Sequence, residues 1–115
     1  MSLTREKYNA LNILLKQLHS DVTATKVDAP QLRQSVTSLQ QFFQQQIVPL
    51  VNDTDSIDEG RLQSYQTEIS KQLRLLEIDV IFLQGARQAS TARHRLDAIG
   101  DRLTTLIEYS NAILQ

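Results

Sequence analysis

The sequence predicts an all-α protein, an antiparallel up-down-up-down four-helix bundle with a long third helix. Apolar residues recur at steps of three and four in four segments, which is the period of one helix face. Only three glycines and two prolines occur among the 115 residues, and no strand-like alternation is present. Amphipathic helices joined by short loops favour antiparallel neighbours. We expect a single domain over residues 1–115.

Composition excludes several classes of function. A formal net charge of −1 gives no general attraction to nucleic acid or to anionic membranes. No cysteine is present, so neither a disulfide framework nor a thiolate site can form. The first residues lack the apolar stretch of a signal peptide, and no apolar run approaches the ~18 residues that span a membrane. We therefore expect a cytoplasmic protein.

The first two helices have clear limits. Apolar spacing predicts a helix from about Thr4 to Ala24. Asp28 is a suitable N-cap for the next helix, and Pro30 falls in its first turn, where a missing N–H costs nothing. Pro49 is expected to kink or end this second helix near Val48.

A loop over residues 52–60, with four acids and a glycine, separates the two halves, and Asp55 or Ser56 can cap the helix that follows. The third helix lies within the stretch from Leu62 to Gln88 and is followed by the segment that begins at Gly85, in which Ser90 or Thr91 can cap the fourth helix. Because the third helix is at least about 40 Å long, we expect it to overhang its neighbours, curve or kink. A three-helix body whose third helix projects into a dimer is the structural alternative.

The third helix carries apolar residues on two sides. An inner stripe occupies roughly an 80° arc and predicts the core-facing side; it comprises Leu62, Tyr65, Ile69, Leu73, Leu76, Val80 and Leu83. Leu75, Ile78 and Phe82 also step by three and four, but point to nearly the opposite side. We call these three residues the outer stripe. Either it forms an interface, to a partner or to a second copy, or it is additional core.

Charged residues near the outer stripe leave structural and functional interpretations open. Asp79 has no ion partner within its own helix, so it is either a core-edge carboxylate, solvated or paired between helices, or an anchor for a partner. Alternating topology places the two basic loops at one end, with Lys26, Arg87, Arg93, His94 and Arg95. Arg87 suits a helix C-terminus and Arg93 can pair with Asp97, whereas Arg95 has no such intrahelical explanation.

No constellation of residues predicts catalysis. The two histidines, His19 and His94, belong to different helices and have no i,i+4 partner that would make a metal-binding face. Neither a glycine-rich phosphate loop nor a nucleophile elbow is present. We expect no enzyme activity, no cofactor and no metal site. A small-ligand bundle would need an apolar cavity with convergent polar groups, which the core stripes do not suggest.

The chain resembles one known family. The segment 64–88, SYQTEISKQLRLLEIDVIFLQGARQ, together with QFFQQQI at 41–47 and DRL…Y at 101–109, is similar to the PatD family of cyanobacteria. This resemblance covers most of the chain and is strongest from Tyr65 to Gln88. It implies a small helical regulator that limits heterocyst frequency and promotes polymerisation of the cell-division protein FtsZ.

The resemblance and the residue pattern lead to one hypothesis. The third helix of a non-enzymatic adaptor binds a protein partner, which the resemblance implies to be FtsZ. The expected partner-binding residues are Lys71, Leu75, Ile78, Asp79, Phe82, Arg87, Arg93 and Arg95. The alternative is a self-associating structural bundle, in which the outer stripe is a homodimer seam.

Overall fold

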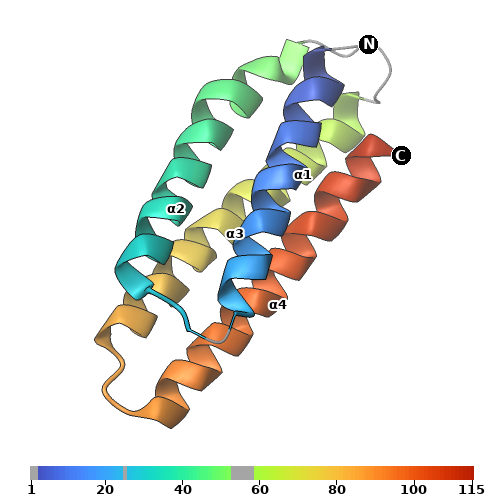
Figure 1. Cartoon of the computed structure of the whole chain (residues 1–115). Helices are drawn as coiled ribbons and strands as arrows, with labels where there is room; N and C mark the ends of the chain where they lie inside the picture. Colours follow the sequence, from blue (N-terminus) through green and yellow to red (C-terminus); the bar gives the residue numbers. More distant parts are fainter. Residues whose placement is uncertain (1–2, 25, 53–58) are drawn as a thin grey trace.

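The computed structural model describes residues 3–24, 26–52 and 59–115, and within them it confirms the antiparallel four-helix bundle (Figure 1). The helices are α1 (Leu3–Val22), α2 (Ala29–Phe42), α3 (Glu59–Gly85) and α4 (Ala89–Leu114). A π-helical turn, η1 (Phe43–Ile47), and a 3-10 turn, η2 (Val48–Asn52), extend α2. The bundle measures 49 × 21 × 19 Å, so the helices run along its length.

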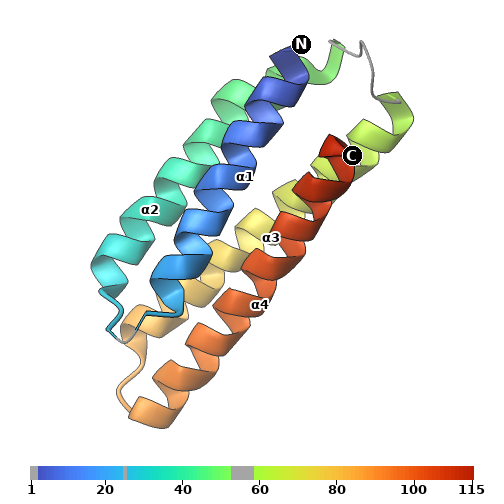
Figure 2. The same cartoon turned by 45° about the vertical axis from the view of Figure 1, so that its right-hand side comes forward.

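Each helix packs against two others. The α1 helix lies against α2 and α4, and α3 lies against the same two from the opposite corner (Figures 1 and 2). In this square arrangement every helix has one side that faces the centre and one that faces away from it. The inward side of α3 is the inner stripe, of which all members but the half-buried Tyr65 are buried. The predicted core face is therefore confirmed.

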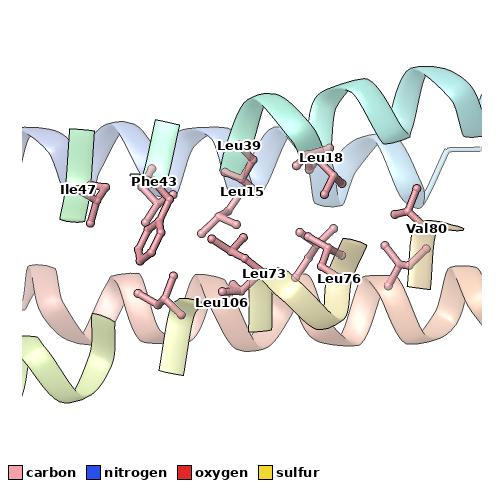
Figure 3. Close-up of a cluster of buried hydrophobic side chains, with 14 of the residues drawn as sticks. Leu15, Leu18, Leu39, Phe43, Ile47, Leu73, Leu76, Val80 and Leu106 are labelled. Atoms are coloured by element: carbon pink, nitrogen blue, oxygen red, sulfur yellow. The ribbon is translucent and has the colours of Figure 1, made fainter. Parts of the chain in front are cut away.

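The centre of the bundle is filled by branched aliphatic side chains from all four helices. Figure 3 shows Leu15 and Leu39 facing Leu73, Leu76 and Leu106 across the core. Toward the chain termini the core ends in aromatic contacts, where the Tyr65 and Tyr109 ring centroids lie 5.8 Å apart. This continuous core holds the four helices together by close apolar packing.

The end of α2 reflects the position of Pro49. Proline cannot donate a helix hydrogen bond, and its ring crowds the carbonyl group four residues earlier. The α-helical pattern stops at Phe42, the Val48 N–H donates to the Phe43 carbonyl in a π turn, and Pro49 lies in the 3-10 turn that follows. The wider turn keeps Phe43 and Ile47 pointing into the core.

The N-cap that the sequence predicts is found for α2 but not for α4. Asp28 is the N-cap of α2, and its carboxylate accepts a hydrogen bond from the Gln31 N–H. The predicted cap of α4 at Ser90 or Thr91 is wrong, because α4 begins earlier, at Ala89, after an extended Gln88 without a side-chain cap. The predicted cap at Asp55 or Ser56 and most of the acidic loop lie outside the described residues.

The third helix does not overhang alone. The hairpin of α3 and α4 projects as a pair past the loop between α1 and α2 (Figures 1 and 2). The two basic loops lie at this end, as the alternating topology predicts. The projection leaves the last turns of α3 and the first turns of α4 with fewer helical neighbours than the middle of the bundle.

Tyr8 is a fully buried side chain of the core with a polar hydroxyl group. It is 0% exposed, and among the described residues no group forms a hydrogen bond of ordinary geometry with its hydroxyl. Burial raises the pKa of Tyr8 to about 12, an effect that the nearby Gln66 side chain opposes. The folded protein therefore holds this phenol in its neutral form.

The first prediction concerns Tyr8→Phe. The buried hydroxyl costs solvation without a good partner, so the variant should be as stable as the wild type or more stable by about 1 kcal/mol at neutral pH. Because the folded-state pKa is raised, the wild type should keep its stability below pH 10 and lose up to about 3 kcal/mol as the pH rises toward about 12. Urea unfolding of both proteins across this range checks it, and equal alkaline losses would contradict it.

Candidate interaction surface

The outward side of α3 carries large apolar side chains in contact with solvent. Ile78 is 40% and Phe82 is 53% exposed, whereas Leu75 is half-buried. Ile81, 43% exposed, extends the surface toward the side of α3 that faces α2. Two of the three outer-stripe residues therefore lie on the surface, and the interpretation of the outer stripe as plain core does not hold for them.

Phe82 is held in place by α4. The guanidinium carbon of Arg95 lies 4.6 Å from the centroid of the Phe82 ring. A cation over the face of an aromatic ring is attracted by its quadrupole, typically by about 0.5–1 kcal/mol at exposed sites. The contact places Arg95 against one face of the ring, while the Phe82 side chain stays 53% exposed to solvent.

The Asp79 carboxylate is engaged within the bundle. It is only 6% exposed; one oxygen accepts a hydrogen bond from Arg102 Nε at 2.7 Å, and the other lies 3.9 Å from Arg95 Nη1. Arg102 also donates to the Gln72 side chain at 3.0 Å. The interpretation of Asp79 as a carboxylate paired between helices is confirmed. Asp79 therefore aligns α3 with α4, and its buried carboxylate is not an open anchor.

The remaining basic residues of the predicted surface are exposed. Lys71 and Arg87 have no ion pair within 4 Å in the described part of the chain. The predicted pair of Arg93 with Asp97 is likewise not found among the described residues, and both side chains are exposed. Arg95, by contrast, does have a structural partner across the helix pair, which intrahelical spacing alone does not reveal.

A groove adjoins the exposed apolar side chains of α3 at Leu75. It encloses about 660 Å³ between η1 and α3 and is lined by Phe43, Val48, Leu75 and the polar side chains of Gln44, Gln66, Thr67, Ser70, Lys71 and Arg74. Gln66 donates to the Ile47 carbonyl at 3.1 Å, which joins the two walls. Leu75 thus lies at the junction of the groove and the exposed stripe.

A second hollow lies beneath the projecting hairpin. It encloses about 940 Å³ between α4 and the loop that follows α1, with Leu83 and Leu96 on its apolar side and His19 and Asp101 on its polar side. The His19 ring nitrogen lies 3.3 Å from the Thr104 hydroxyl, whereas His94 is exposed on α4. The described residues contain no group of three His, Cys, Asp or Glu residues placed to hold a metal ion.

Sequence reasoning missed Ile81, Arg74 and Arg102. Ile81 follows Ile78 by three residues but lies between the two stripes, so a search for regular stripes passes over it. Arg74 is exposed at the base of the outer stripe. Arg102 pairs with Asp79 from another helix, and no spacing within one helix can predict such a contact.

Comparison with protein-family models, with curated proteins and with solved structures finds no match. The structure defines the class of the protein as an antiparallel four-helix bundle with an apolar, basic surface on its α3–α4 side. Within the described residues, no helix is both long and apolar enough to cross a bilayer.

The second prediction tests the pairing of Asp79 with Arg102. A double-mutant cycle with Asp79→Ala and Arg102→Ala should give a coupling of about 1–2 kcal/mol, because the carboxylate is buried while the arginine remains partly solvated. Urea unfolding of the four proteins measures this coupling. Asp97→Ala, at an exposed carboxylate of α4, is the control and should change stability by less than about 0.5 kcal/mol. No coupling would mean that the two helices are aligned by apolar packing alone.

Proposed function

We propose that the chain is a non-enzymatic interaction module that binds a protein partner through the outward side of α3. The observation that carries this proposal is the adjacency of Ile78, Ile81 and Phe82, three large apolar side chains, each at least 40% exposed, within five consecutive residues. Adjacent exposed apolar side chains usually mark an interaction surface. We name their exposed surface, together with Leu75, the α3 patch.

The surface is also rigid, which favours specific binding. The opposite side of the same helix is anchored by buried side chains such as Leu76 and Val80, so α3 cannot rotate its outer residues inward. The contact of the Phe82 ring with Arg95 favours one orientation of the ring, which lowers the entropy that binding would cost at that position.

Exposed apolar residues elsewhere are more scattered. Ile13 is 60% exposed on α1, and its neighbour Leu14 lines a groove between α1 and α2. Leu3 lies at the start of α1, far along the helix from both. The α3 patch combines more apolar residues than either location, and we therefore place the partner there.

The resemblance of the sequence to the PatD family supplies the particular partner and role. We propose that the chain binds FtsZ, promotes its assembly, and acts in the cytoplasm of a filamentous cyanobacterium to limit heterocyst frequency. Partner binding uses Ile78 and Phe82 as apolar anchors, with Lys71 and Arg87 at the margins. Arg93, which lines the hollow beneath the hairpin, is left out of this surface. Asp79 and Arg95 support these residues from within the bundle.

The third prediction compares Phe82→Asp with Ile13→Asp. Both replace an exposed apolar residue of a helix by an acid, so each should keep the helicity and change the free energy of unfolding by about 1 kcal/mol or less. Only Phe82→Asp should abolish binding to purified FtsZ and the increase in FtsZ sedimentation that the wild type produces. A large loss of stability in Phe82→Asp would assign Phe82 to the core.

Light scattering of the free protein at micromolar concentration separates the proposal from the self-associating alternative. A monomer leaves the α3 patch available for another protein. A stable dimer that Phe82→Asp dissociates and Ile13→Asp does not would identify the patch as a homodimer seam, and the proposed function would fail.

A further inference from the structure

We infer that the segment which binds the α3 patch is acidic and amphipathic, with apolar side chains between carboxylates. The inference rests on the proposed function, because it names the chemistry of the partner at the same site. It is carried by the distribution of charge around the patch.

Every strongly exposed charged side chain between residues 71 and 88, the part of the chain that carries the patch and the loop after it, is basic. Lys71 and Arg74 lie on α3 at one end of the patch, and Arg87 lies in the hairpin loop beyond the other end. Arg93 lines the hollow beneath the hairpin with Asp97, so it does not border the patch. The two acids of this stretch do not offset them at the surface, since Glu77 is half-buried and Asp79 is buried. The apolar patch is therefore bordered by cations at both ends.

These cations are not neutralised within the bundle. Both ion pairs found among the described residues use the same carboxylate, Asp79, and neither includes Lys71, Arg74 or Arg87. Arginine side chains bind carboxylates through two parallel hydrogen bonds, which adds geometric specificity to the attraction. A partner that brings carboxylates to these positions gains ion pairs without breaking existing ones.

The dimensions of the patch limit the size of the segment. Phe82 lies eleven positions after Lys71 along α3, which corresponds to about 16 Å at 1.5 Å per residue. About three turns of a partner helix cover that length, with apolar residues at helical spacing as in other helix-mediated interfaces. The carboxylates would lie beyond the two ends of its apolar face.

The same charges argue against a second copy of the chain as the occupant. A two-fold symmetric contact places the same surface on both sides. If the helices ran in opposite directions, Lys71 and Arg74 would face the Arg87 end of the other copy. If they ran in the same direction, each cation would approach its own equivalent. Both arrangements bring like charges together, whereas an acidic segment brings opposite charges together.

The test uses two synthetic helical peptides of about three turns. Both carry leucine at positions i, i+3, i+4 and i+7; the acidic peptide has glutamate at the other positions, and its twin has lysine there. Each is titrated into the isotope-labelled full chain and followed by NMR. The acidic peptide should shift resonances of residues 71–85 and leave Ile13 unchanged, and its affinity should fall roughly tenfold in about 1 M salt. The lysine twin should not bind.

Charge reversal provides the matched variants. The double variant Lys71→Glu, Arg74→Glu should no longer bind the acidic peptide and should bind the lysine twin. Lys16→Glu combined with Lys26→Glu reverses two exposed lysines on α1 and the following loop and should leave binding unchanged. Equal binding of both peptides, or binding of neither at millimolar concentration, would overturn the inference.

Three further outcomes separate this inference from its rivals. Binding to vesicles containing anionic lipid that exceeds binding to the acidic peptide, and that the double reversal at Lys71 and Arg74 abolishes, would assign the patch to a membrane surface and overturn it. If Phe82→Asp disrupts FtsZ binding while the peptides do not discriminate by charge, the proposed function stands and the acidic-segment inference fails. If FtsZ does not bind but the acidic peptide does, the proposal that the partner is FtsZ fails, and the inference that the partner segment is acidic stands.

Discussion

The organisation of this bundle depends on which side of α3 faces inward. A helix at one corner of a square bundle can turn only one side to the core, and α3 has apolar residues on two sides. The inner stripe is the longer and more regular of the two, so its burial gains more free energy and sets the rotation of the helix. The other apolar side is then left at the surface as a consequence of core packing.

Asp79 connects this rotation to the properties of the surface. Its buried carboxylate lies on the side of α3 that faces α4, where Arg102 satisfies it and Arg95 approaches it. Arg95 in turn lies over Phe82. A single acid of the core edge thus links two helices and, through Arg95, connects to the most exposed aromatic ring. Residues that looked independent in sequence act as one structural unit.

The periodic spacing of apolar residues predicted the fold, but it did not predict most details of the surface. Regular apolar spacing identified four helices and the buried face of α3, because core burial is the dominant constraint on such helices. The Asp28 cap was predictable from local chemistry, but Ser90 and Thr91 suggested a cap that α4 does not use. Contacts between helices, such as Asp79 with Arg102, depend on relative rotation and axial alignment, which no single segment encodes.

Solvent accessibility of the isoleucine methyl groups tests the central claim most directly. NMR relaxation by a soluble gadolinium chelate should affect Ile78 and Ile81 as strongly as Ile13, which is exposed on α1, while the buried Ile69 stays protected. The account predicts this pattern in the free protein at every concentration where it is monomeric. Protection of Ile78 and Ile81 equal to that of Ile69 in the monomer would show that the bundle covers both sides of α3, and would contradict the account.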